Sequence, residues 1–167
     1  MNDQPTIRVI RILLVDDEET LLEYLSKRLL RQGHTVKAAF SGEEAIEAAK
    51  QEHFDVAVVD LKMPGIDGVE TQARLREIQP FLQCIVLTGH GSIESALESG
   101  HEEAFKYLLK PVDYDNLVAV INKAYEKKME LQEAKFQKQL EELHHHGMGA
   151  RGMKKAIAEL RKIYGFE

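Results

Sequence analysis

The chain has 167 residues, 44% of them hydrophobic, which is enough for one domain of ordinary size and a smaller additional segment. Its formal net charge is −6, which argues against a chain-wide role in binding nucleic acid or a membrane surface, because phosphate-rich partners require positive charge. No apolar stretch approaches the roughly 20 residues that a membrane-spanning helix needs.

The amino terminus and the cysteine content indicate a cellular compartment. Residues 1–6 are polar, we expect them to be disordered, and they show no secretory signal. Cys84 is the single cysteine, so an internal disulfide is impossible and a reducing compartment is favoured. We therefore expect a cytoplasmic protein in which Cys84 is a small buried hydrophobic residue.

The first third of the chain alternates between strand and helix patterns. Residues 7–15 are apolar and β-branched and predict a strand, which is followed by four acids at 16–19. Leucines at helical spacing predict the next helix, and Gly33 ends it. A second strand is predicted at residues 35–40. Ser41 and Glu44 form a capping-box pattern for a helix at 42–51, with Ala45, Ile46 and Ala49 facing inward.

The central part of the chain continues the alternation. The apolar run at 56–59 predicts a buried strand that ends in Asp60, and turn residues follow it. A helix is predicted at 68–78, closed by Pro80, with its inner face formed by Val69, Ala73, Leu75 and Ile78. The elements expected after it are a strand at 84–87, a short helix at 92–99, a strand at 104–109 and a long helix from Asp113.

This order of elements predicts the fold class. Strands that alternate with helices form a parallel sheet with helices on both faces. Five such units fit the flavodoxin-like, doubly wound α/β class with strand order 2-1-3-4-5, in which the functional site lies outside the carboxyl ends of the strands.

Reactive side chains stand at the predicted carboxyl ends of four strands: Asp16 and Asp17, then Asp60, Thr88 and Lys110. Three adjacent carboxylates repel one another unless a cation is present, and oxygen ligands favour Mg²⁺. Asp60 would keep a free oxygen as nucleophile, while Lys110 and Thr88 would contact an incoming phosphoryl group. The pattern therefore predicts phosphoryl transfer onto Asp60.

Each of these residues also has a simpler interpretation. Asp16 and Asp17 could only stabilise the amino terminus of the next helix, Asp60 could be a turn residue, and Lys110 could be a solvated surface lysine. Their joint occurrence at the ends of four predicted strands favours a site.

Four motifs carry a resemblance to a known family: L-L-V-D-D-E at 13–18, D-L-K-M-P-G-I-D-G at 60–68, L-T-G-H-G at 87–91 and Y-L-L-K-P at 107–111. With them, residues 7–127 resemble the receiver domain of two-component response regulators. The resemblance implies that Asp60 is the phosphoacceptor and that a histidine kinase or phosphotransfer protein supplies the phosphoryl group.

The resemblance also implies a metal site and a switch. Asp17, Asp60 and the backbone carbonyl of Lys62 would bind Mg²⁺ directly, and Asp16 would act mostly through water. Lys110 would pair with Asp60 before transfer and with the phosphoryl oxygens afterwards, aimed by a cis peptide bond to the following proline. Thr88 and Tyr107 would be the switch residues that reshape the partner surface, which we expect at 92–125.

The sequence departs from the family pattern near that surface. Glu102, Glu103 and Lys106 make residues 99–106 unusually charged, so the partner surface of this chain need not resemble that of relatives. Lys62 and His90 flank the expected phosphoryl position and could tune the lifetime of the phosphoryl group, although solvated side chains are an equal alternative.

Residues 128–167 form a predicted helical extension. The long helix continues to residue 143, with an interrupted apolar stripe of Tyr125, Met129, Phe136, Leu140 and Leu143. The stripe favours homodimerisation or the docking of a partner, and packing on the chain's own tail is the alternative. Three histidines at 144–146 and Gly147 break the helix; a structural metal site there is disfavoured, because adjacent side chains point in different directions.

A short amphipathic helix is expected at 153–164. Its apolar stripe is Met153, Ala156, Ile157, Leu160 and either Ile163 or Tyr164, and its opposite face is basic. This tail is too small for a helix-turn-helix with its own core, so nucleic acid is not the expected partner.

The functional expectation is a phosphorylation-activated regulator rather than an enzyme, with at most self-catalysed phosphoryl transfer and dephosphorylation. Two alternatives belong to other classes. A Mg²⁺-dependent phosphohydrolase with Asp60 as nucleophile generally needs a second acid two residues later, where this chain has Lys62. A DNA-binding regulator would act through the basic tail.

Overall fold

The structure, a computed structural model, describes residues 8–89 and 104–166. Five parallel strands form one sheet in the order β2-β1-β3-β4-β5, as predicted. The strands are β1 (Arg11–Val15), β2 (Thr35–Ala39), β3 (Val56–Asp60), β4 (Gln83–Thr88) and β5 (Lys106–Leu109). The predicted helix at 92–99 and residues His90, Glu102 and Glu103 lie outside the described residues.

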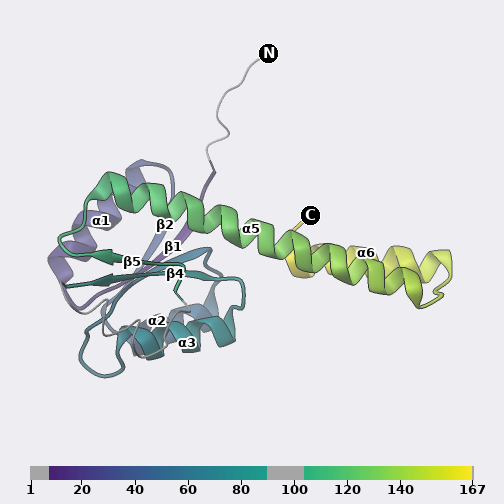
Figure 1. The fold of residues 1–167 in the computed structure, drawn as a ribbon, viewed down its shortest axis with the longest axis horizontal. Helices are drawn as coiled ribbons and strands as arrows, with labels where there is room; N and C mark the ends of the chain where they lie inside the picture. The colour runs from purple at the N-terminus through teal and green to yellow at the C-terminus, as the bar shows by residue number, and fades with distance from the viewer. Residues whose placement is uncertain (1–7, 90–103, 167) are drawn as a thin grey trace, which may run out of the picture. The chain divides into compact units, whose positions relative to one another are not determined.

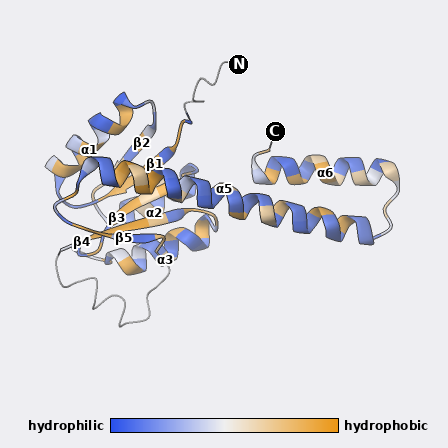
Figure 2. Ribbon diagram, turned by 45° about the horizontal axis from the view of Figure 1, so that its top comes forward, coloured by the Kyte–Doolittle hydropathy of each residue, from blue (hydrophilic) through white to orange (hydrophobic). Residues whose placement is uncertain are grey.

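Helices cover both faces of the sheet (Figure 1). On one face, α1 (Glu19–Arg31) and the first turns of α5 (Tyr114–His145) pack leucines and isoleucines against the strands. On the other face, α2 (Gly42–Gln51) and α3 (Gly68–Ile78) enclose a second apolar cluster. Figure 2 shows hydrophobic residues concentrated in the central strands and mixed with hydrophilic ones along the helices. This three-layer arrangement is the predicted doubly wound fold.

The first and fifth strands are shorter than predicted. Pairing of β1 with β2 begins at Arg11, so residues 8–10 are not part of the strand. Pairing of β5 with β4 begins at Lys106, two residues after the predicted start. A strand extends only as far as its neighbour offers partners, and β-branched composition does not reveal where that neighbour ends.

The helix termini follow the predicted capping chemistry in part. Ser41 Oγ accepts a hydrogen bond from the backbone N–H of Glu44 at 3.2 Å, whereas the Glu44 carboxylate accepts from Phe40, one residue before the cap. α3 has an unpredicted cap, because the Asp67 carboxylate accepts from the backbone N–H of Glu70 at 2.9 Å. Both caps satisfy helix N–H groups that have no partner within the helix.

The inner face of α3 is more polar than predicted. Of the four residues expected there, only Leu75 is fully buried. Its buried neighbours on the same face are Thr71 and Gln72. Gly42 has no side-chain carbon, and a Cβ there would collide with the Thr71 hydroxyl, so α2 and α3 approach closely at this point.

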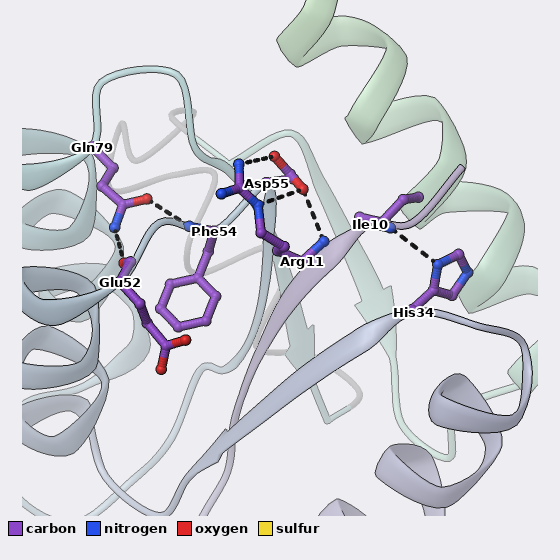
Figure 3. Close-up of polar contacts among 7 residues, drawn as sticks. All are labelled: Ile10, Arg11, His34, Glu52, Phe54, Asp55 and Gln79. Atoms are coloured by element: carbon purple, nitrogen blue, oxygen red, sulfur yellow. Dashed lines mark hydrogen bonds and ion pairs between the residues drawn. The ribbon is translucent and has the colours of Figure 1, made fainter. Parts of the chain in front are cut away.

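Polar contacts fasten the amino ends of the strands, opposite the edge that carries the reactive residues (Figure 3). The buried Asp55 carboxylate accepts hydrogen bonds from the backbone and guanidinium of Arg11 at 2.8 to 3.4 Å. The Gln79 side chain accepts from the backbone N–H of Phe54 and donates to the carbonyl of Glu52. These contacts anchor the start of β1 and β3.

The chain divides into two compact units after Tyr125, two residues before the predicted end of the domain at 127. In the second unit, the remainder of α5 and α6 (Ala150–Tyr164) form a helical hairpin. Phe136 packs against Tyr164 with ring centroids 6.0 Å apart and against Phe166 at 5.1 Å. The apolar stripe that favoured dimerisation thus contacts the chain's own tail, and a homodimer stays a prediction.

The hairpin resolves two details of the tail. Tyr164 is buried while Ile163 is 72% exposed, so Tyr164 completes the apolar stripe of α6. α5 continues through His145, slightly beyond the predicted break at residue 144. The imidazole Nδ1 of each of the three histidines, as an N–H, donates to the carbonyl four residues earlier at 2.7 to 2.8 Å. These contacts add side-chain donors to backbone carbonyls in the last turns of α5.

Within residues 8–89 and 104–166, no helix has both the length and the apolar composition that crossing a membrane requires.

Candidate functional site

The register of the sheet brings the ends of the strands to one edge. Val15 of β1 pairs with Val59 of β3, and Asp60 pairs with Leu87 of β4. Thr88 pairs in turn with Leu109 of β5. The residues that follow these pairs therefore gather at the carboxyl edge of the sheet, as expected for a parallel doubly wound fold.

Three acids converge at this edge. Each of Asp16, Asp17 and Asp60 offers a carboxylate oxygen, and these oxygens lie within 4.8 Å of one another. Asp16 and Asp60 are buried, and Asp17 is exposed. Asp16 uses both of its oxygens, because Oδ1 accepts from the backbone N–H of Glu18 at 2.9 Å and Oδ2 accepts from Lys110 at 2.8 Å.

Lys110, in the loop after β5, contacts two of these acids, Asp16 and Asp60, and also Glu18. Its Nζ lies 2.8 Å from Asp16 Oδ2, 3.2 Å from Glu18 Oε1 and 3.5 Å from Asp60 Oδ1. The ion pair with Asp60 that the resemblance implied is present, and Asp16 is the nearer partner of Lys110. The Lys110–Pro111 peptide bond is cis, as the resemblance implied.

The surroundings of Asp60 disfavour its charged form. Burial, followed by the negative charge of Asp16, raises the pKa of Asp60 from 3.8 to about 6, although Lys110 and the backbone N–H of Lys62 oppose the shift. Burial lowers the pKa of Lys110, but its hydrogen bond to Asp16 and the charges of Asp16 and Asp60 outweigh this effect and raise it. The site therefore has more negative charge than Lys110 alone can balance.

The two predicted switch residues lie on adjacent strands. Thr88 is buried at the end of β4, and its hydroxyl donates to the carbonyl of Gly89 at 3.2 Å. Tyr107 is half-buried on β5, where it packs with Val86 and Leu61, and burial raises the pKa of its phenol. The roles assigned to Thr88 and Tyr107 stay predictions.

Sequence reasoning missed two residues that support the site. Glu18 contacts Lys110, and the signal for it was a glutamate at the N-cap position of α1, where Ser, Thr, Asp or Asn is preferred. Gly68 packs against the backbone of Asp60 and Leu61, and a Cβ at this position would meet the Asp60 carbonyl oxygen and Leu61 Cα. The signal for Gly68 was a glycine at the first position of a predicted helix.

The arrangement suits a hard divalent cation. Three carboxylate oxygens within 4.8 Å of one another are close enough to bind one ion, and oxygen ligands of this kind favour Mg²⁺ over softer metals. The raised pKa of Asp60 agrees with this, because a carboxyl group whose charged form is disfavoured gains from a positive charge beside it. Asp16, Asp17 and Asp60 are the one group of this kind among the residues that the structure describes.

Comparisons with known proteins agree with the fold and identify a family. The family model described as the response regulator receiver domain matches residues 12–122. The transcriptional regulatory protein GlrR of Escherichia coli is 39% identical over 115 residues, which are 69% of this chain and 26% of GlrR. The chain thus spans about a quarter of the length of that relative.

Solved structures give the same result. A response regulator receiver domain protein from Clostridium thermocellum is 34% identical with a TM-score of 0.68, and the match covers 74% of this chain and 99% of the other. The response regulator protein TrrA from Thermotoga maritima, in complex with Mg²⁺ and BeF, is 32% identical with a TM-score of 0.62 over 70% of this chain and 99% of TrrA.

Proposed function

Because the chain belongs to the response regulator receiver domain family, we propose that it is a signalling switch in which Asp60 accepts a phosphoryl group. The observation that carries this proposal is the convergence of Asp60 with two further acids and Lys110 at the carboxyl edge of the sheet. A histidine kinase or a phosphotransfer protein is the proposed donor.

The geometry suits a direct transfer. A carboxylate oxygen of Asp60 forms the new bond to phosphorus as the bond between phosphorus and the leaving atom of the donor breaks. The Lys110 ammonium, 3.5 Å from Asp60 Oδ1, is close enough to pair with the oxygens of the transferred group. Thr88 is placed one residue beyond the partner of Asp60 in β4, within the same edge. The residues supply mainly position and charge.

The proposed metal ligands are Asp17, Asp60 and the backbone carbonyl of Lys62, with Asp16 acting through water. When bound, Mg²⁺ supplies the positive charge that the phosphoryl oxygens and the three acids require. The structure of TrrA with Mg²⁺ and BeF supports the choice of ion, because this chain resembles TrrA over most of its length.

The proposed output is a change of the partner surface at 92–125. Thr88 would move toward the phosphoryl group, and Tyr107 would turn inward into the space that it leaves. Phosphorylation is then a local charge event that shifts a two-state equilibrium. The described part of this surface comprises β5 and the first turns of α5, and residues 92–103 lie outside the described residues.

Intact-mass measurement after treatment with acetyl phosphate and Mg²⁺ tests the proposal. We expect the wild-type chain to gain one phosphoryl group and Asp60→Asn to gain none. Asp67→Asn is the matched control, because Asn is as good an N-cap as Asp and α3 should stay intact. A phosphoryl adduct that persists in Asp60→Asn would refute the assignment.

The phosphohydrolase alternative fits the site less well. Lys62, not an acid, stands two residues after Asp60, and its side chain is exposed. We propose that the chain is not an enzyme beyond transfer to and release from its own aspartate. Steady turnover of a phosphate monoester would contradict this view.

The DNA-binding alternative draws on the exposed face of α6. Five basic residues of α6 are exposed: Arg151, Lys154, Lys155, Arg161 and Lys162. GlrR is a transcriptional regulatory protein, but this chain covers only 26% of it. We propose a protein partner and a cytoplasmic location instead, and a salt-dependent shift of duplex DNA at low salt would favour the alternative.

A further inference from the structure

Glu18 occupies the N-cap position of α1 without acting as a cap. Its backbone has extended angles, φ −80° and ψ 95°, and its side chain makes no hydrogen bond to the first turn of the helix. Its backbone N–H donates instead to Asp16 Oδ1 at 2.9 Å. Glutamate is not among the residues preferred at this position, so its side chain is free for another contact.

The Glu18 carboxylate reaches across the site to Lys110. The Lys110 ammonium donates to Asp16 at 2.8 Å and to Glu18 at 3.2 Å, while Asp60 lies at the longer distance of 3.5 Å. An ammonium group has three N–H donors, and Asp16 and Glu18 accept hydrogen bonds from it, which leaves fewer donors for groups beside Asp60.

We propose that Glu18 is a positioning residue that draws Lys110 away from Asp60 and thereby slows the phosphorylation of Asp60. The inference rests on the proposed function and adds a regulator of the same site. A Lys110 that is shared with Glu18 is less available to the oxygens of the incoming phosphoryl group. The Glu18 side chain is 63% exposed, so the effect is that of a partly screened ion pair.

Three variants separate the direct contact between Glu18 and Lys110 from the general effect of negative charge near the site. Glu18→Gln removes the negative charge, whereas Glu18→Asp keeps it and shortens the side chain by one methylene, so that it no longer reaches Lys110. Glu19→Gln removes the same charge from the next residue, which is exposed in the first turn of α1. Aspartate is a favourable N-cap, so Glu18→Asp should not weaken α1.

The measurement is the rate of phosphorylation by acetyl phosphate at saturating Mg²⁺, followed by intact mass over a range of donor concentrations. We expect Glu18→Gln and Glu18→Asp to raise the maximal rate by about two- to fivefold, the range that a partly exposed ion pair supports. The half-saturating donor concentration should stay unchanged, and Glu19→Gln should match the wild type. A purely structural role for Glu18 would lower the rate rather than raise it.

Three results would overturn the inference. They are a rate in Glu18→Asp equal to the wild type, an unchanged or lower rate in Glu18→Gln, and an equal gain in Glu19→Gln. The proposed function is judged separately by the wild-type adduct and its loss in Asp60→Asn. If the wild type gains no phosphoryl group, both the proposed function and the role of Glu18 fail. If the wild type is phosphorylated but Glu18→Gln and Glu18→Asp react at the wild-type rate, only the role of Glu18 fails.

Discussion

The environment of Asp60 disfavours the negatively charged form of its carboxyl group. Because burial and Asp16 raise its pKa to about 6, the folded chain without metal holds a proton at Asp60 under conditions in which an unfolded chain has lost it. The positive charge of Lys110 is balanced mainly by Asp16, because Lys110 Nζ lies 2.8 Å from Asp16 Oδ2. The negative charge of Asp60 is therefore only partly balanced. The burial of Asp60 and its incompletely balanced charge therefore lower the stability of the fold, and the same features suit Asp60 to react.

The pH dependence of stability follows from this shift. The pKa of Asp60 rises from 3.8 in the unfolded chain to about 6 in the folded one, so its contribution to stability is fully present below pH 3.8 and is lost as the pH rises through about 6. Without metal, we expect Asp60→Asn to raise the melting temperature more at pH 7.5 than at pH 4.5. The difference between variant and wild type, measured by thermal denaturation, isolates Asp60 from other groups.

Mg²⁺ provides the control for this prediction. If the ion binds among the three acids, it should raise the melting temperature of the wild type at pH 7.5 more than that of Asp60→Asn. A variant that melts at the same temperature as the wild type at both pH values would show that Asp60 is not strained by its charge.

At the scale of single elements, the start of α3 determines where Asp60 lies. Gly68 is the first residue of α3, and its N–H donates to the carbonyl of Leu61 at 2.9 Å. Leu61 in turn donates to the carbonyl of Leu87 at 2.8 Å. The turn between β3 and α3 is therefore bonded both to its own helix and to the neighbouring strand, and glycine permits the close approach.

Gly68→Ala tests this contact. The added Cβ would meet Leu61 Cα at 2.7 Å as well as the Asp60 carbonyl, so the backbone that carries Asp60 has to shift. We expect a loss of roughly 1–3 kcal/mol in the free energy of unfolding, in the range of overpacked sites, together with slower phosphorylation. Urea denaturation measures the first effect and intact mass after acetyl phosphate treatment measures the second.

Gly152→Ala is the matched control. Gly152 lies inside α6, and a Cβ there would meet only the Met148 side chain at 3.9 Å. The same substitution should therefore be neutral or stabilise the helix by up to about 1 kcal/mol. Equal behaviour of the two variants would mean that Gly68 is not required by packing against Asp60.

At the scale of the whole molecule, the chain combines a receiver domain with a helical hairpin that has its own aromatic contacts. The hairpin is small, and its buried aromatic residues are Phe136 and Tyr164. A two-helix unit of this size has little apolar surface, so a single buried aromatic residue contributes a large share of its stability.

Phe136→Ala should open the hairpin. Truncation of a buried phenylalanine costs about 3–5 kcal/mol, and a loss of about 3 kcal/mol raises the open population roughly a hundredfold. We expect faster trypsin cleavage after Lys154, Lys155 and Arg161, with phosphorylation of Asp60 unchanged. Leu131→Ala, on the same helix but 38% exposed, should cleave like the wild type.

Phe136→Ala also tests whether the apolar stripe of α5 joins two chains or packs on the tail of its own chain. If sedimentation shows a wild-type dimer that Phe136→Ala dissociates, the stripe joins two chains, as its pattern first suggested. Cleavage of Phe136→Ala at the wild-type rate would contradict the hairpin, because its central aromatic contact would then be dispensable.

Local chemistry in the sequence determined the elements, their order and the candidate residues. Hydrophobic periodicity, together with capping and turn signals, predicted α2 and α3 with their observed bounds, and the residues Asp16, Asp60, Thr88 and Lys110 were predicted to share one edge of the sheet. Such features depend on neighbours along the chain, which a sequence displays directly.

Only the tertiary structure showed which residues from different elements contact one another. It showed that Lys110 lies nearer to Asp16 than to Asp60 and also contacts Glu18, and that Gly68 supports the Asp60 backbone. It also showed that Phe136 contacts the tail of its own chain. These outcomes depend on how closely the elements pack against one another in three dimensions, and spacing along the chain does not give those distances.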